Sequence, residues 1–309
     1  MLADGRPTTT ESAQLTCAVG DADAQLALWT LYELTYRGFD GVPEELEWDP
    51  DLLRLRAQLE ASFESVLRRE AVDLVASVAD VRDPADQVLA MVDRADGVSL
   101  STFLRREATR DQVLDYLRER SVQQLKESDP QSFLLPRLTG AAKVALAEIQ
   151  YDEYGAGDPA RLHQHLYAAA LSAAGLDSSY GAYIDHISAV SLAAANLSSL
   201  LCLNRRLRGA ALGHFAAFEA SSSVPSRRVA AAVERVGLGP TVAAYFEEHV
   251  EADAVHEQVA ARDMCGAWVA EHPERRDDVL FGAAAALHLD SLSAKDLMSR
   301  WATDGWSAA

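Results

Sequence analysis

The chain has 309 residues, of which 28 are Lys or Arg and 47 are Asp or Glu, so its formal net charge is −19 at pH 7. This acidic balance disfavours nucleic acid or an anionic membrane surface as a partner, and no apolar run approaches the roughly 20 residues needed to span a bilayer. Hydrophobic residues make up 49% of the sequence, against only 17 Gly and 10 Pro. This composition predicts a large core and excludes a turn-rich all-β protein.

The start of the chain and its cysteines indicate a reducing compartment. The first residues, MLADGRPTTTESAQL, contain neither the basic start nor the apolar block of a signal peptide. Cys17, Cys202 and Cys265 lie far apart in the sequence, and an odd number of cysteines cannot complete a disulfide framework. We therefore expect a cytoplasmic protein with free thiols.

The first part of the chain shows helical spacing of its apolar residues. After a flexible lead-in over residues 1–20, a helix is expected from Asp21 to about Gly38, followed by an acidic loop. Further helices are predicted over 52–78, from Pro84 onward, and as a pair over 99–120. Residues 21–120 are thus expected to form an N-terminal helical layer.

The second part is predicted to be a helical core over residues 121–309. Helices are expected at about 138–154, 159–174, 179–221, 226–271 and 275–289. Glycine and proline at 155–159, 224–226 and 237–240 predict breaks between or within them, since proline removes a helical hydrogen bond. The whole chain is therefore predicted to be all-α.

The sequence EHVEADAVHE contains three side chains that can bind a metal. His249, Asp253 and His256 are spaced i, i+4 and i+7, which places them within about 60° of one another on a helix. Two imidazoles and a carboxylate suit Fe(II), and zinc less specifically. The alternative is a solvated polar face on an acidic helix.

A second pair of candidate ligands flanks a glycine-rich connection. Glu153 is expected at the end of one helix and His163 in the first turns of the next, and a tight turn can bring them together. His163 shares a helical face with Leu166 and Tyr167, whereas His165 points away toward solvent. A satisfied core histidine is the alternative interpretation of His163.

Glu219 is the third candidate, because it shares a helical face with apolar residues such as Phe215. A carboxylate there is costly to bury unless it is paired, for example with Arg208, or bound to a cation. With the residues above, the chain offers three carboxylates and three histidines from separate helices, which is the ligand set of a di-iron carboxylate site. A ferritin-like site needs two carboxylate-x-x-His pairs, and only Asp253 and His256 form one among the candidates.

Three segments together resemble the haem-oxygenase-like di-iron oxidase/oxygenase family, also described as iron-containing redox enzymes. They are EIQYDEYGAG…RLHQHLY (148–167), LNRRLRGAALGHFAAFE (203–219) and EEHVEADAVHE (247–257), and the resemblance covers about residues 120–275. It implies a seven-helix bundle and two Fe ions that activate O2 as a co-substrate. The metal ligands that it implies are Glu153, His163, Glu219, His249, Asp253 and His256.

The resemblance also bears on the reaction. Members that N-oxygenate amines have one carboxylate ligand more, and Glu127, 26 residues before Glu153, is the candidate seventh ligand; either of the two could be the additional one. An acid beside a turn is the alternative interpretation of Glu127. The expected function is N-oxygenation of an amine or amino-acid-derived metabolite, as in secondary metabolism.

Two other functions remain open. One is a di-iron oxidase of the same fold that cleaves, decarboxylates or desaturates a fatty or amino acid. The other is a haem-binding or non-catalytic helical protein, although a haem protein needs one proximal histidine and no carboxylate cluster.

Five further residues are candidates for binding a small-molecule substrate. Arg205, Arg206 and Arg208 could hold a substrate carboxylate in a bidentate fork, with salt bridges in an acidic protein as the alternative. Tyr167 and Tyr183 could line the pocket, with core packing as the alternative. An external electron donor and a homodimer are further expectations, and the N-terminal layer could be a packing layer, a lid or a dimer surface.

Overall fold

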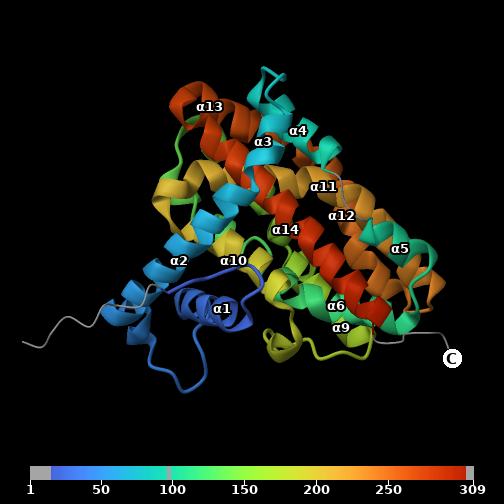
Figure 1. Ribbon diagram of the computed structural model, residues 1–309. Coiled ribbons are helices and arrows are strands. Elements are labelled where there is room, and N and C mark those ends of the chain that lie inside the picture. The colour runs from blue at the N-terminus through green and yellow to red at the C-terminus, as the bar shows by residue number, and fades with distance from the viewer. Residues whose placement is uncertain (1–14, 96–98, 304–309) are drawn as a thin grey trace, which may run out of the picture.

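The computed structural model describes residues 15–95 and 99–303, apart from the side chains of residues 251–254 and 303. These described residues form helices and turns and contain no strand, which confirms the predicted all-α fold. Long helices cross one another at the centre of the molecule, and shorter ones cover them (Figure 1). Within the described part of the chain, no helix is both long and apolar enough to cross a membrane.

The N-terminal helices begin where the sequence supplies caps. Asp21, Asp49, Asp83, Ser99 and Thr109 each precede a helix and accept a hydrogen bond from a backbone N–H of its first turn. The elements are α1 (Ala22–Tyr36), η1 (Glu44–Trp48), α2 (Pro50–Glu70), α3 (Val72–Ser77), α4 (Pro84–Arg94), α5 (Leu100–Arg106) and α6 (Arg110–Gln124). The expected helix at 52–78 is therefore two helices.

The second half of the chain contains the longest helices. Its α-helices are α7 (Asp129–Ser132), α8 (Gly140–Glu153), α9 (His163–Ala173), α10 (Ala189–Leu203), α11 (Arg208–Arg235), α12 (Pro240–Gln258), α13 (Ala267–Glu271) and α14 (Arg276–Thr303). A π-helix, η7 (Val259–Gly266), joins α12 to α13. Short 3-10 turns lie at η2 (Leu135–Arg137), η3 (Gly155–Gly157), η4 (Pro159–Arg161), η5 (Ile184–His186), η6 (Arg205–Leu207) and η8 (Pro273–Arg275).

The structure corrects three predicted helix limits. The break expected at Pro225 is wrong, because α11 continues through this proline. A proline inside a helix lowers its stability by about 3 kcal/mol. The extensive packing of α11 against α12 and α14 outweighs that loss. The helix expected from Pro159 begins instead at His163, after a 3-10 turn, and α14 continues past residue 289 to Thr303.

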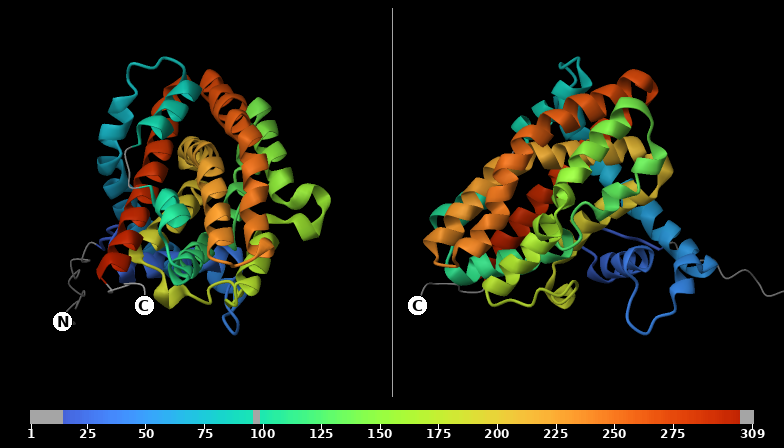
Figure 2. Two further views of the ribbon diagram at one scale, coloured as in Figure 1. Left: turned by 90° about the vertical axis from the view of Figure 1, so that its right-hand side faces the viewer. Right: turned by 180° about the vertical axis from the view of Figure 1, so that it is seen from behind.

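α11 is the central helix of the bundle. It packs against α12 and α14, while α12 also packs against α9, and η7 contacts α8, α11 and α4 (Figures 1 and 2). α11 and α14 approach closely at two glycines: a Cβ at Gly213 would overlap the carbonyl oxygen of Val279, and one at Gly282 would overlap that of Ala210. Small residues at these positions let the two backbones touch.

The N-terminal helices lie directly on the helices of the second half. α1 packs against α10, and α4 and α5 pack against α11. The predicted boundary at residue 120 falls within α6, and the division into a lead-in, a layer and a core stays a prediction. Cys17, Cys202 and Cys265 are buried free thiols, as expected.

Candidate metal centre

Six buried carboxylate and histidine side chains gather inside the bundle in two groups of three. In each group the candidate ligand atoms lie within 4.8 Å of one another, and every member is at most 8% exposed. The first cluster consists of Glu127, His163 and His249, and the second cluster of Glu153, Glu219 and His256. Two such clusters are compatible with a di-iron site.

α12 contributes one histidine to each cluster. His249 and His256 are seven residues apart, so they project from the same side of the helix two turns apart. The Nδ1 atom of His249 lies 2.8 Å from the backbone carbonyl oxygen of Tyr245, which leaves Nε2 facing the first cluster, 3.4 Å from Oε2 of Glu127. A metal-binding histidine commonly has its second ring nitrogen held in this way.

The turn between α8 and α9 brings Glu153 and His163 together. Glu153 is the last residue of α8 and His163 the first of α9. Gly155 has φ +79°, and a Cβ there would lie 2.8 Å from the backbone of Arg161, so the turn needs glycine. As predicted, the chain reverses over the glycine-rich segment, and His163 is buried while His165 is exposed.

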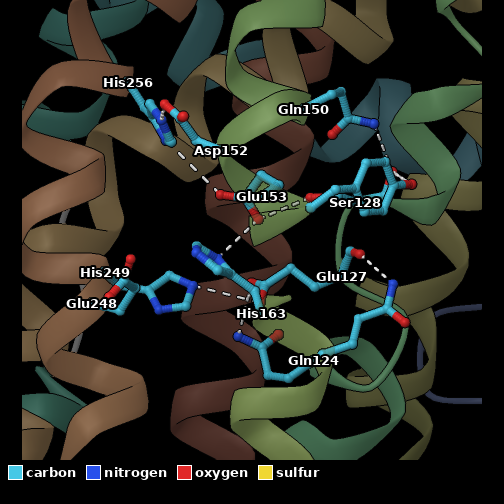
Figure 3. A network of polar contacts seen from close by, with 12 residues as sticks. Gln124, Glu127, Ser128, Gln150, Asp152, Glu153, His163, Glu248, His249 and His256 are labelled. Atoms are coloured by element: carbon cyan, nitrogen blue, oxygen red, sulfur yellow. Dashed lines mark hydrogen bonds and ion pairs between the residues drawn. The ribbon is translucent and has the colours of Figure 1, made fainter. Parts of the chain in front are cut away.

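Glu153 belongs to the second cluster and also faces the first, so it lies where the two clusters meet (Figure 3). Its Oε2 is 3.1 Å from Nδ1 of His163, and its Oε1 is 3.8 Å from Nδ1 of His256. Burial raises the pKa of Glu153, but the hydrogen bond and charge of His163 and the charge of His249 lower it below its usual range. This carboxylate therefore stays ionised and presents one oxygen to each cluster.

The second cluster centres on His256. Its Nδ1 lies 3.4 Å from Oε2 of Glu219 in α11, and its Nε2 lies 3.2 Å from Oδ2 of Asp152. Although burial lowers the pKa of His256, Glu219, Asp152 and Glu153 together raise it to about 9. Asp152 is half exposed, so it connects the buried cluster to the surface of the protein.

Glu127 is held at the first cluster by its neighbours. The Tyr245 hydroxyl donates to Oε2 over 2.9 Å, and the Gln124 side-chain amide donates to Oε1 over 3.4 Å. Gln164 of α9 donates to the backbone carbonyl of Glu127 over 2.7 Å. Glu127 is therefore a buried acid in the turn after α6, and it faces His249.

The turn that carries Glu127 has a strained backbone. Ser128 adopts φ +68°, a left-handed conformation that is uncommon for a residue with a side chain. Its hydroxyl donates to Oε2 of Glu153 over 2.9 Å, and its carbonyl accepts from the Gln150 side chain, also over 2.9 Å. The strained residue thus links Glu127, which precedes it in the sequence, to the carboxylate between the clusters.

Helix α1 supports the same turn from the N-terminal side. Lys126 forms an ion pair with Glu33 of α1, and both side chains are at most 3% exposed. The Tyr180 hydroxyl donates to Glu33 over 2.8 Å, and Arg37 donates to the Leu125 carbonyl over 2.9 Å. Sequence reasoning missed these residues, because Lys-Glu-Ser-Asp reads as a solvated polar turn.

One predicted ligand cannot be compared with the structure. The side chain of Asp253 lies outside the described residues, so its place relative to the clusters stays a prediction.

The three arginines lie away from the clusters. Arg206 donates to Glu64 over 2.5 Å, and the Arg208 guanidinium lies 5.0 Å from the ring centroid of Trp268. Arg205 and Arg206 are exposed, at the 3-10 turn before α11. The salt bridge of Arg206 to the buried Glu64 matches the alternative interpretation of that one residue.

The two tyrosines pack within the protein. Tyr167 is fully buried, donates to the Leu117 carbonyl over 2.7 Å and packs edge-on against Tyr245. The Tyr183 hydroxyl accepts from the backbone N–H of Asp177 in the connection between α9 and α10. Tyr167 therefore packs on Tyr245, whose hydroxyl in turn donates to Glu127 of the first cluster.

A partly open cavity of about 30 Å³ adjoins both clusters. Its lining includes Glu127, Glu153 and Glu219, but among the described residues none of the three cluster histidines. The carboxylates thus face the cavity and the histidines lie behind them. The remaining lining residues are Gln123, Gln124, Lys126, Ser128, Pro130, Gln131, Ala195, Ser198, His214, Phe215 and Phe218.

Comparison with known proteins agrees with this arrangement. The sequence model of one family, described as iron-containing redox enzyme, matches residues 114–291. This range is more than half of the chain and includes all six residues of the two clusters, together with Asp253. No curated protein matches the chain.

Proposed function

Since the chain belongs to the iron-containing redox enzyme family, we propose that it is a non-haem di-iron oxygenase that transfers oxygen to the nitrogen of a small metabolite. The observation that carries the proposal is Glu153, whose two oxygens face two separate carboxylate–histidine clusters. One carboxylate between two such clusters is the arrangement that a bridging ligand of two metal ions requires.

The donor set supports iron in these clusters. We propose Glu127, Glu153, Glu219, His163, His249, His256 and Asp253 as ligands of two Fe ions. Buried carboxylates need cations or paired partners, and the described members of this set face one another inside the bundle. Carboxylates and imidazoles are suitable ligands for Fe(II). A haem would instead need one proximal histidine in a pocket without a carboxylate cluster.

Iron held by these residues would supply the electrons that reduce O2, and an external electron donor would restore them. The chain itself fixes the ligands. Glu153 holds the two clusters in register, Tyr245 and Gln124 orient Glu127, and Asp152 orients the His256 ring through Nε2. The cavity admits the substrate on the carboxylate side and keeps bulk water from the buried histidines.

N-oxygenation is the reaction favoured by Glu127. Its buried position at the first cluster supports it as a further carboxylate ligand, which together with Asp253 would make four carboxylates and three histidines. Decarboxylation of a fatty or amino acid would call for a cation to hold the substrate carboxylate. Lys126 is the one cationic side chain among the described lining residues, and Glu33 already pairs with it.

The test is to supply the iron-loaded protein with heavy-isotope O2, a reductant and a panel of amines and carboxylic acids. Mass spectrometry should detect one heavy oxygen atom bound to nitrogen in an amine product, and none with His256→Ala, which removes a ligand. Glu127→Gln should lower the rate of this reaction. Shortened or desaturated carboxylic acids without oxygenated amines would instead establish the oxidase alternative.

A further inference from the structure

Three buried side chains at the cavity have hydrogen-bonding capacity that the described residues leave unused. His214 of α11 is 5% exposed, and burial alone, without a hydrogen bond or a neighbouring charge, lowers the pKa of its ring. The side-chain carbonyl oxygens of Gln124 and Gln131 have no hydrogen-bond partner among the described residues. Each of these two residues is 8% exposed. Buried polar groups are nearly always paired, so this group is prepared for a molecule that the chain itself does not supply.

These three side chains differ from the rest of the polar network around the cavity. Gln124 uses its amide nitrogen to hold Tyr245 and Glu127, which fixes its carbonyl oxygen in place. Burial lowers the pKa of His214 to about 4, so its ring is neutral at neutral pH and offers one donor and one acceptor. The unused groups are therefore mostly acceptors, and none of them is charged.

The cavity also lacks a free charge once metal is bound. Lys126 is neutralised by Glu33. The positive charges of two Fe(II) ions would balance the negative charges of four carboxylates. These are Glu127, Glu153, Glu219 and, as proposed above, Asp253. Phe215 and Phe218 supply apolar lining. A charged substrate would lose its hydration here without gaining a partner, unless it bound the metal directly.

We propose that this cavity selects an uncharged substrate with N–H donors, which His214, Gln131 and Gln124 recognise by hydrogen bonds. The proposal rests on the proposed function, since it places the substrate on the carboxylate side of the two clusters. An uncharged amine keeps the nitrogen lone pair that oxygen transfer requires. Binding without a proton also avoids burying an ammonium ion in a neutral pocket.

Binding of three probes of similar length tests the proposal in the anaerobic, Fe(II)-loaded protein at neutral pH. Pentanamide carries N–H donors, methyl pentanoate is neutral without them, and pentanoate is anionic. Ligand-observed NMR should show pentanamide binding about tenfold tighter than either of the others, the ratio expected for one well-made hydrogen bond. Equal binding of pentanamide and methyl pentanoate, or tighter binding of pentanoate, would overturn the proposal.

Variants assign the preference to named side chains. His214→Leu and Gln131→Leu should each reduce the preference for pentanamide over methyl pentanoate by several-fold, while His214→Gln, which keeps a donor and an acceptor, should retain most of it. Because burial alone acts on the His214 ring and the Gln131 side-chain carbonyl oxygen has no hydrogen-bond partner among the described residues, these variants should keep the wild-type iron content and circular dichroism spectrum. A preference unchanged in both leucine variants would also overturn the proposal.

Failure of this inference differs from failure of the proposed function. Pentanamide and methyl pentanoate are both uncharged, so their affinity ratio is also measured in metal-free protein, where it reports on the cavity alone. If the chain bound no iron, the di-iron proposal would fail while this ratio still decided the substrate class. If iron bound normally and the ratio were one, only the substrate inference would fail.

Discussion

Asp152 makes the sharpest test of a single residue around the clusters, because it contacts His256 without belonging to either cluster. Its Oδ2 lies 3.2 Å from Nε2 of His256. Asp152→Asn should weaken Fe(II) binding by about 10–100-fold, the usual effect of removing a carboxylate that orients a metal-binding histidine. Anaerobic Fe(II) titration measures this, with the exposed Glu148 of the same helix providing the control Glu148→Gln. Equal affinities in both variants would rule out this role for Asp152.

The burial of His214 predicts that the free energy of unfolding depends on pH. Its pKa is lowered by burial to about 4, below the 6.5 of an exposed histidine. Between these values the unfolded chain binds a proton that the folded chain does not, so the free energy of unfolding falls as pH falls from about 6.5 to 4. The loss has a slope of up to about 1.4 kcal/mol per pH unit.

Urea denaturation of metal-free protein across this pH range measures the effect. His214→Gln removes the titrating group, so its unfolding free energy should fall less steeply than that of the wild type over the same interval. Parallel pH curves for the two proteins would show that His214 is protonated as easily in the folded state as in the unfolded chain.

Sequence spacing identified most of the clustered residues but not what surrounds them. The shared side of His249 and His256 could be predicted because helical residues follow one another at a fixed angle. The proximity of Glu153 and His163 could be predicted because a glycine-rich turn reverses the chain between them. Glu127 remained ambiguous, since nothing in a short polar turn says that it is buried. Contacts across distant elements, such as Ser128 with Glu153, depend on tertiary packing, which no local pattern encodes.

At the scale of elements, α1 stabilises the turn between α6 and α7 through the buried pair of Glu33 and Lys126. Glu33→Gln would leave the Lys126 ammonium buried and unpaired, so we expect a loss of about 3–5 kcal/mol in unfolding free energy. The double variant Glu33→Gln/Lys126→Met should recover much of that loss. Chemical denaturation measures both.

A matched control for this pair lies at the surface. Asp51 pairs with Arg54 while 81% of its side chain is exposed, so Asp51→Asn should leave the denaturation midpoint unchanged. If Glu33→Gln behaved like Asp51→Asn, the pair of Glu33 and Lys126 would not be what holds the turn.

The contact of α11 with α14 gives a prediction about packing. Gly213→Ala would push a methyl group into the carbonyl of Val279, which the two long helices can relieve only by moving apart. Overpacking of this kind costs about 1–3 kcal/mol or more, and the midpoint of thermal unfolding should fall accordingly. Gly266→Ala is the control, because its Cβ would meet its nearest neighbour at 3.7 Å. Equal midpoints for the two variants would contradict the close packing.

Most helices followed from apolar spacing and caps, and the failures have a common physical cause. Proline at 225 predicted a break, yet tertiary contacts along α11 hold the helix intact. The sequence pattern predicts that α14 ends near residue 289, because apolar residues repeat less clearly beyond it. The packing of the bundle nevertheless continues the helix to Thr303. Local propensity therefore located the helices, while the packing of the bundle decided how far they extend.

At the scale of the whole molecule, the match to the family model begins at residue 114. Residues that stabilise the surroundings of the clusters lie further toward the N-terminus, in α1. Glu33 of α1 and Arg37, which directly follows α1, both contact the turn that carries Glu127. The N-terminal helices thus do more than cover the bundle, and this role could not be predicted from motifs that all lie in the second half of the chain.

The most direct test of the account is the number of irons per chain after anaerobic loading with Fe(II) and removal of excess metal. We expect two in the wild type and at most one in Glu153→Gln, because the carboxylate between the clusters would lose its charge while keeping its shape. A wild type that binds one iron or none, or a Glu153→Gln variant that still binds two with wild-type affinity, would contradict the central claim.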